Sequence, residues 1–500
     1  MRILLVPRNF MPTCVGSAAM FTLDLAHALG ARDQVRILWG ETDPHHPWEG
    51  PAAVCSGSHE GVETTTVTLP EPAEPNECLD LVNPLAVEAF GAGLDDFRPD
   101  LVHFQDLGPL SAAAVWECGE RGLPVALTLR DYWATCHRRS LITAGGRACA
   151  GPEGGVRCAV EGCLLLPGDE WRPLTAEVRR NLSSLGRRQR SLQRAAAEPP
   201  IPPWYRALQR VPQPVKGLAP TWLRHLARRT AVGAAPDLWE PASRQDRDAL
   251  VWAEWATAHS RFRFQMLERT LARVGLLTTP SPAVQGSLES AGGQPGRCLV
   301  LADGPQRERL AGWARKAGGR LTFAYLGAVH PARGLEALVR AFDRLPPGAA
   351  RLIIAGPADG DYFAQLRGLA GGSEVLFLGR VAPHQLAAFF SEVDVVVLPS
   401  ARREPMPGAL SYARHLRLPV IAAAAGDLAQ AVGAQGGGLT YPPGDIAALE
   451  ACLSRFVDEP GLALALGEAA PAVAPAEEIA VRLREEYEGL TASDRPAGRR

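Results

Sequence analysis

Short apolar runs that alternate with helical stretches constrain the fold of this chain more than any other feature. The first half carries such runs at 3–6, 101–104, 125–129 and 276–281. A strand that is apolar on both faces has to be covered on both faces, as in parallel sheets whose crossover helices lie on each side. We therefore expect an α/β fold built on a doubly wound parallel sheet.

The same alternation returns in the second half, with apolar runs at 323–327, 352–356, 375–379, 393–398 and 420–423. After the first of these runs, apolar residues recur with the i, i+3, i+4, i+7 spacing of a core-facing helix, namely Leu335, Leu338, Val339 and Phe342. A chain of 500 residues exceeds what one hydrophobic core normally supports. A second sheet in a second domain is therefore expected.

These patterns divide the chain. We expect an N-terminal Rossmann-like domain at 1–310, a second Rossmann-like domain at 318–470, and a C-terminal helix at 476–490 that packs back on the first domain. The segment 164–260 interrupts the first domain and is rich in Arg and Pro, with scattered Trp. A helical insertion with a solvated Arg face is the plainer interpretation. A lid over an acceptor site and a peripheral membrane contact are the alternatives.

The composition and the lengths of the apolar runs limit the partners and the cellular location that we expect. The net charge of −2 gives no reason to expect nucleic acid as a partner. The first apolar run is too short for a secretory signal, and no run of 18 apolar residues would span a membrane. We expect a cytoplasmic protein, with the inner face of the membrane as a second location, whose ten cysteines stay reduced. The sequence does not specify an oligomeric state.

The segment 404–412 is the most informative about function. It reads Glu-Pro-Met-Pro-Gly-Ala-Leu-Ser-Tyr, follows the apolar run Asp394 to Ser400, and precedes another at 418–422. It resembles the E-x7-E element of glycosyltransferase family 4, with Tyr412 at the position of the second Glu. Three further segments in the expected order are similar to that family: 327–334, Gly379-Arg380-Val381, and 394–400.

The resemblance implies the GT-B fold, in which two Rossmann-like domains face a central cleft. It also implies a hexosyltransferase-type enzyme without a redox cofactor. Such an enzyme moves a sugar from a nucleotide-diphosphate donor to a glycan, a lipid-linked acceptor or a small molecule, with retention of configuration. Polysaccharide biosynthesis is one setting in which such an activity is used.

The family carries several roles over to this sequence. Glu404 is expected to hydrogen-bond the hydroxyls of the donor sugar as a catalytic residue. A departing diphosphate requires a fixed cation and helix N-terminal amides, and Arg333 supplies the cation. At Tyr412 a phenol replaces a carboxylate and cannot be a bidentate acceptor for ribose, so weaker nucleotide binding is expected. The full set of expected donor contacts is Gly16, His103, Arg333, Gly334, Arg380, Val381, Met406, Pro407, Gly408, Ala409 and Tyr412.

A second departure lies at 128–133, Thr-Leu-Arg-Asp-Tyr-Trp, which resembles the family's T-x-H-D-Y-W. Arg130 stands where the family has a catalytic His, and a guanidinium cannot accept a proton near neutral pH. Arg130 is instead a candidate to bind an anionic acceptor or the donor phosphates. Two functions stay open alongside active transfer. One is a catalytically impaired protein that binds a nucleotide sugar, a glycan or a partner enzyme; the other is another GT-B enzyme such as an epimerase.

Four cysteines cluster in a Gly-rich loop that follows this segment: Cys136, Cys149, Cys158 and Cys163. Four thiolates satisfy tetrahedral zinc and would stabilise a loop that lacks an apolar core. A branch of the same family carries a similar Cys-rich loop. Structural zinc is therefore expected, with free or paired thiols and an iron–sulfur cluster as alternatives.

Overall fold

The structure is a computed structural model. It describes residues 1–12, 16–43, 45, 51–70, 81, 83–108, 110, 112–136, 263–290, 297–316, 319–358, 360–371, 374–400, 406–434 and 436–493. The predictions for Glu404, Cys149, Cys158, Cys163 and the 164–260 segment lie outside these residues. By its contacts the chain divides into a compact unit of 1–142 with 266–500 and another of 143–265, and every element named below belongs to the first.

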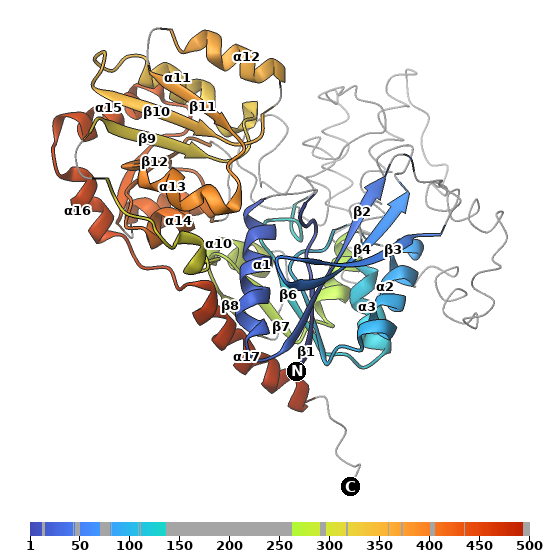
Figure 1. Cartoon of the computed structure of the whole chain (residues 1–500). Coiled ribbons are helices and arrows are strands. Elements are labelled where there is room, and N and C mark those ends of the chain that lie inside the picture. Colours follow the sequence, from blue (N-terminus) through green and yellow to red (C-terminus); the bar gives the residue numbers. More distant parts are fainter. Residues whose placement is uncertain are drawn as a thin grey trace, which may run out of the picture. The chain divides into compact units, whose positions relative to one another are not determined.

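In the described part of the chain, the first sheet has eight strands in the order β3-β4-β2-β1-β5-β6-β7-β8 (Figure 1). All neighbouring strands pair in parallel except β3 and β4. The strands are β1 (Arg2–Val6), β2 (Gln34–Asp43), β3 (Ala53–His59), β4 (Val62–Pro70), β5 (Leu101–Phe104), β6 (Val125–Thr128), β7 (Leu276–Thr279) and β8 (Cys298–Val300). The helices are α1 (Ser17–Gly30), α2 (Pro84–Phe97), α3 (Ala113–Glu120) and α10 (Pro282–Ser290).

The second sheet has six described strands, all parallel, in the order β11-β10-β9-β12-β13-β14. They are β9 (Leu321–Leu326), β10 (Ala350–Ala355), β11 (Val375–Gly379), β12 (Val395–Leu398), β13 (Val420–Ala423) and β14 (Gly438–Tyr441). The helices are α11 (Leu335–Phe342), α12 (Gly360–Leu369), α13 (Leu386–Ser391), α14 (Gly408–His415), α15 (Ile446–Asp458), α16 (Leu462–Ala469) and α17 (Ala476–Ser493). Short turns of 3-10 helix lie at η2 (Glu308–Leu310), η3 (Pro331–Arg333) and η4 (Pro383–Gln385), and a π-helical turn, η5, at Ala429–Ala434. The two sheets confirm the predicted α/β fold with two doubly wound parallel-sheet domains.

Alternation along β9 shows how the second sheet is covered on both faces. Phe323 and Tyr325 belong to an apolar cluster with side chains of α11, α12 and α15. Ala324 belongs to a second cluster that includes residues of α13 and α14. Because successive strand side chains point to opposite faces, a continuous apolar run is what a strand between two helical layers requires.

The β3–β4 hairpin was missed by the sequence analysis. Its two-residue turn, Glu60-Gly61, has positive φ at both positions, 46° and 82°, as a type I′ turn requires. The side chains of β3 from Ala53 to Ser58 are exposed. The strand therefore lacks the continuous apolar run from which the other strands were predicted. The Gly in the turn was the available signal.

Two connections between the sheets lie against each other. A methyl group added to Gly304, which follows β8, would lie 1.8 Å from the carbonyl oxygen of Ala474, which precedes α17. In the same connection Arg309 forms a buried ion pair with Asp24 of α1, with 2.6 Å between Nη2 and Oδ1. The backbone amide of Gln306 donates to the other oxygen of Asp24 at 3.1 Å. Helix α1 therefore anchors the chain where it leaves the first sheet.

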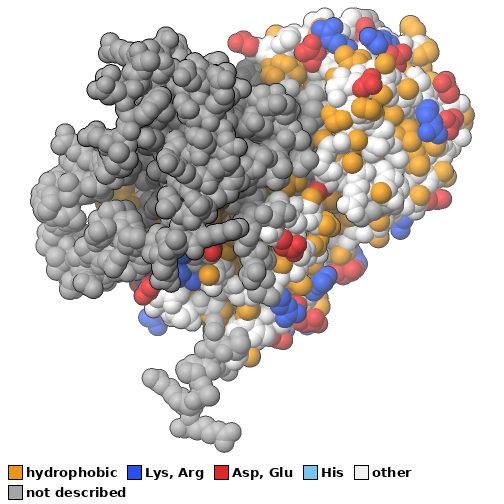
Figure 2. All heavy atoms as spheres, turned by 180° about the vertical axis from the view of Figure 1, so that it is seen from behind, with side chains coloured by type: hydrophobic (Ala, Val, Ile, Leu, Met, Phe, Trp, Pro, Cys, Tyr) orange, Lys and Arg blue, Asp and Glu red, His pale blue; other side chains and the backbone are white. Residues whose placement is uncertain are grey.

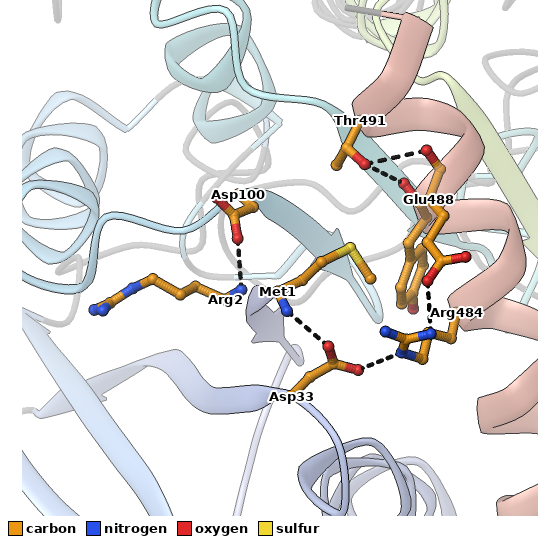
Figure 3. Close-up of polar contacts among 8 residues, drawn as sticks. Met1, Arg2, Asp33, Asp100, Arg484, Glu488 and Thr491 are labelled. Carbon is orange, nitrogen blue, oxygen red and sulfur yellow. Dashed lines mark hydrogen bonds and ion pairs between the residues drawn. The ribbon is translucent and has the colours of Figure 1, made fainter. Parts of the chain in front are cut away.

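Helix α17 follows the second sheet in the sequence and packs against α1. Asp33, whose side chain is fully buried, accepts from the Met1 ammonium at 2.7 Å and from Nε of Arg484 at 2.9 Å (Figure 3). Arg484 also pairs with Glu488 one turn further along α17. The first strand and the last helix are thus joined through one carboxylate.

The described surface carries charges of both signs. On the face drawn in Figure 2, Lys and Arg side chains lie interspersed with Asp and Glu. Pairs such as Arg340 with Glu336 and Arg344 with Glu450 contribute little to stability because solvent screens them. Within the part of the chain that the structure describes, no helix is both long and apolar enough to cross a membrane.

We expect Asp33→Asn to lower the free energy of unfolding by about 1–3 kcal/mol, because the Met1 ammonium and Arg484 lose their shared buried counter-charge. Urea denaturation at neutral pH measures the change. Asp96→Asn is the matched control, since the Asp96 carboxylate is 67% exposed in its pair with Arg36. The control should change the same quantity by less than about 0.5 kcal/mol. Equal effects of the two variants would contradict the importance of the buried carboxylate.

Candidate functional site

Polar side chains gather at the carboxyl ends of the strands of the first sheet. Gln105 follows β5, Arg130 follows β6 and Asp303 follows β8. The Arg130 guanidinium donates through Nη2 to Oε1 of Gln105 at 2.6 Å and pairs through Nη1 with Asp303. Its Cζ also lies 4.9 Å from the ring centroid of Phe21 on α1. Parallel pairing brings these residues to one edge of the sheet, where ligands bind in open α/β folds.

Burial lowers the pKa of Arg130 to about 10, and the charge of Asp106 acts in the opposite direction. The guanidinium therefore stays protonated at neutral pH and cannot act as a general base. Its side chain is only 9% exposed and its charge is matched by Asp303. The sequence predicted a catalytic or anion-binding Arg130; the structure shows a guanidinium held between two protein side chains.

His103 at the end of β5 lies in a buried polar network and is 1% exposed. Its Nδ1 is 2.5 Å from the hydroxyl of Tyr487 on α17, and its Nε2 is 2.8 Å from Oγ1 of Thr128. The amide nitrogen of Gln105 lies 3.0 Å from Nδ1. Both ring nitrogens thus have partners within the protein. These hydrogen bonds join α17 to the end of β5 through the imidazole ring, and the expected contact of His103 with a donor stays a prediction.

The protonation state of His103 follows from its surroundings. Burial lowers its pKa to about 3, and the positive charge of Arg130 acts in the same direction. The imidazole is therefore neutral at physiological pH. Since Oε1 of Gln105 accepts from Arg130, its amide nitrogen faces His103, and the network runs from α17 through His103 and Gln105 to Arg130.

In the second sheet, the candidate site lies where helices begin. Gly408 is the first residue of α14, and Pro407 is its N-cap. A methyl group at Gly408 would lie 2.4 Å from Cβ of Ser17, the first residue of α1. The N-terminus of α1, which follows β1 of the first sheet, therefore meets the N-terminus of α14, which follows β12 of the second sheet. Neither helix has an acidic residue in its first turn.

This meeting of helix ends has an electrostatic consequence. The first N–H groups of a helix lack intrahelical partners, and the aligned peptide dipoles place about half a positive charge at that end. Two such ends in contact favour an anion beside them. Gly16 is the N-cap of α1, and a methyl group there would have no atom of the described residues within 4 Å. The predicted residues Gly16, Met406, Pro407, Gly408 and Ala409 are thereby brought together by α1 and α14.

A third helix begins nearby in the fold. Gly334 is the N-cap of α11, with φ at 73°, and a methyl group there would lie 2.2 Å from the carbonyl oxygen of Pro399. Both the left-handed backbone and this approach require glycine. Arg333 is the last residue of η3 and immediately precedes that glycine. The start of α11 and the end of β12 are therefore adjacent, and the contact of Arg333 with a donor phosphate stays a prediction.

Tyr412 is buried more deeply than a nucleotide contact would suggest. Its ring stacks on Phe390 with 5.5 Å between centroids and is 8% exposed. Burial and the charge of Asp24 raise its pKa, while Arg309 acts in the opposite direction. The phenol is therefore neutral and belongs to the apolar cluster behind α14. Its predicted bond to ribose stays a prediction.

The remaining predicted residues are Arg380, Val381 and Glu404. Arg380 and Val381 follow Gly379, the last residue of β11, whose φ is 66°. Val381 packs on the apolar cluster that contains Tyr412. Glu404 lies outside the described residues, two positions before Met406. The sequence analysis did not single out Gln105 and Asp303. Gln105 directly follows the predicted strand 101–104, and this position was the signal that could have found it.

The zinc prediction rests mainly on residues that are not described. Cys136 is buried, carries a free thiol and has its backbone amide bonded to the carbonyl of Tyr132. Its three predicted partners lie outside the described residues. Among the described residues, no group of three or more His, Cys, Asp or Glu side chains could hold a metal ion.

Among known protein families, the match lies in the second half of the chain. Residues 320–459 match the family model described as glycosyl transferases group 1. This range contains α11, α14 and the strands between them, so the starts of α11 and α14 belong to a segment of glycosyltransferase type, whereas the start of α1 lies outside it. No curated protein matches the chain.

Solved structures resemble the chain over nearly its whole length. Sucrose-phosphate synthase from Thermosynechococcus elongatus is 18% identical with a TM-score of 0.59, covering 98% of this chain and 99% of that one. HepE of Anabaena in complex with UDP is 14% identical with a TM-score of 0.53, covering 99% and 98%. The UDP-forming trehalose-phosphate synthase of Burkholderia xenovorans with glucose 6-phosphate is 11% identical with a TM-score of 0.55, covering 98% and 100%. At these identities the likeness establishes the GT-B fold.

We expect the buried neutral His103 to make stability depend on pH. Its pKa is about 3 in the folded protein against 6.5 ordinarily, so between these values the unfolded chain binds a proton that the native state does not. Stability therefore falls as the pH is lowered through this window, by about 2 kcal/mol at pH 5. Denaturation of the wild type and His103→Gln at about pH 8 and pH 5 measures the difference. The variant should lose about 2 kcal/mol less on acidification; identical losses would contradict a neutral buried imidazole.

Proposed function

We propose that this protein transfers a sugar from a nucleoside-diphosphate sugar to an acceptor. The observation that carries the proposal is the contact between Ser17, at the start of α1 in the first domain, and Gly408, at the start of α14 in the second domain, whose residues 320–459 are of glycosyltransferase type. Two helix ends in contact offer main-chain N–H groups to a diphosphate. The neighbours with UDP, or described as UDP-forming, support a donor of this class.

The chemistry follows from where charge develops. As the bond between sugar and diphosphate breaks, negative charge grows on the leaving group, and preorganised N–H donors stabilise that charge without reorganising. The amides at the starts of α1 and α14 are such donors. Arg333, beside the start of α11, is proposed to add a fixed positive charge.

The finer assignments come from the sequence resemblance. We assign retention of configuration and membership in glycosyltransferase family 4 on the 404–412 and 128–133 segments. Glu404 is proposed to accept hydrogen bonds from the donor sugar. Arg130 cannot act as a base, so the donor phosphate itself is proposed to take the acceptor proton. We propose a cytoplasmic site of action and an acceptor that is a glycan, a lipid-linked sugar or a small molecule.

A second function is favoured by two specific observations. Arg130 stands at the catalytic His position and is paired with Asp303, and Tyr412 stands at the second Glu position and is buried against Phe390. Both departures weaken groups that the family uses on its donor. A protein that binds a nucleotide sugar, glycan or partner enzyme without turnover is the alternative. Nucleotide binding without transfer to any acceptor would distinguish it from an active transferase.

Gly408→Ala tests the contact between the helix ends. A methyl group there overlaps Cβ of Ser17, and relieving an overlap of this kind costs about 1–3 kcal/mol. If α14 moves away from α1 to relieve it, UDP or ADP should bind about tenfold more weakly, measured by calorimetry or by the nucleotide-induced rise in Tm. Gly368→Ala is the control, because Gly368 is exposed on α12 and a methyl group there meets no atom of the described residues within 4 Å. Equal nucleotide affinity in the two variants would argue against the site.

Glu404→Gln tests the predicted donor-sugar contact. The substitution keeps the size of the side chain and removes its charge, so kcat with the best donor should fall about 100-fold while UDP alone binds nearly as before. Glu459→Gln serves as the control, since Glu459 lies in a surface pair with Arg455 at the end of α15. An undiminished kcat in Glu404→Gln would remove Glu404 from the mechanism and leave the helix ends as the site.

A further inference from the structure

One cation at the strand ends of the first sheet is not used by the site described above. Arg8 follows β1 by two residues and is half-buried. In the part of the chain that the structure describes, Arg8 makes no ion pair or hydrogen bond. Two other partly buried arginines have carboxylate partners: Arg130 pairs with Asp303 and Arg309 pairs with Asp24.

The strand order gives Arg8 a special position. From β1 the chain crosses to β2 on one side, whereas β5 lies on the other side of β1. The order of strands reverses between β1 and β5, and in open α/β sheets ligands bind outside the carboxyl ends of the strands at such a reversal. The backbone N–H of Gln105 donates to the carbonyl of Val6 at 2.8 Å, so β1 and β5 remain paired up to this point.

The chain leaves room for the Arg8 side chain at this reversal. Gly108, which is buried and follows β5, lies against the aliphatic stem of Arg8. A methyl group on Gly108 would lie 2.4 Å from Cγ and 3.0 Å from Cα of Arg8. The stem is therefore fixed between the ends of β1 and β5, while the guanidinium has no counter-charge from the described residues.

We infer that Arg8 recognises an oxyanion on the acceptor, a phosphate or a carboxylate, and so makes this site specific for an anionic acceptor. A planar guanidinium pairs with two oxygens of either group at once. This inference rests on the proposed function. The start of α14 and Arg333 belong to the second domain and are assigned to the donor diphosphate. Arg8 lies between the ends of β1 and β5 in the first domain, where only the amides at the start of α1 are assigned to the donor, so Arg8 is assigned to the acceptor.

Arg8→Gln tests the inference in the full-length protein. The probes are inorganic phosphate, hexose 6-phosphates, hexuronates and the uncharged hexoses, each titrated by calorimetry with UDP present and absent. We expect at least one anion to bind the wild type more tightly than its uncharged counterpart, and Arg8→Gln to weaken that binding about tenfold to hundredfold. The phosphate and carboxylate arms distinguish the two sources of the oxyanion.

Arg32→Gln is the matched control, since Arg32 is exposed between α1 and β2, at the opposite end of the strands. It should leave both anion and UDP affinity unchanged. Three results would overturn the inference: no anion preferred over its uncharged counterpart, equal anion affinity in Arg8→Gln and wild type, or a loss of UDP affinity in Arg8→Gln, which would place Arg8 on the donor. Failure of the wild type to bind UDP or ADP is a separate result that would count against the proposed function itself.

Discussion

Parallel pairing of the strands is the constraint on which the rest of this structure depends. In a parallel sheet every strand ends at the same edge, so residues far apart in the sequence are collected there without any further interaction. Gln105, Arg130 and Asp303 follow three different strands and still form one hydrogen-bonded group. The same geometry in the second sheet puts the end of β12 beside the start of α11. Parallel strands cannot be joined by a tight turn, so helices connect them by crossing over the sheet.

Two buried carboxylates beside the first sheet, Asp24 and Asp33, have charged partners, and these pairs tie distant segments together. Removing a charge from water is unfavourable unless a partner and further hydrogen bonds compensate. Asp24 has Arg309 and a backbone amide, and Asp33 has an ammonium and a guanidinium. In both cases the partner comes from a segment that is distant in sequence. Charge pairing thus fixes the connection between the sheets and the last helix, which apolar packing alone would place less specifically.

The two departures from the family pattern acquire a physical context. Arg130 does not simply replace a histidine, because Asp303 supplies the counter-charge that a buried guanidinium needs. Tyr412 does not simply replace a carboxylate, because its ring stacks on Phe390 within an apolar cluster. Each substitution is therefore accommodated by its neighbours. Such accommodation is compatible with a transferase that handles its donor differently and with a protein that only binds.

The sequence by itself determined the fold class and most strand positions, because a continuous apolar run has few alternatives to a strand buried between helices. It also identified the segments around Gly408 and Gly334, through their resemblance to elements of glycosyltransferase family 4. It did not reveal the β3–β4 hairpin, whose outer strand is exposed and short of apolar residues.

Only the tertiary structure decided which side chains meet. The contact between Ser17 and Gly408 joins residues of different domains, and the partners of His103 lie on β6 and on α17. His103 looked like a ligand-facing histidine in the sequence because it ends a strand. Its role as a buried link to Tyr487 depends on where the last helix packs, and strand spacing carries no information about that. Local patterns specify elements, whereas the pairing of distant polar groups is settled only when the elements are assembled.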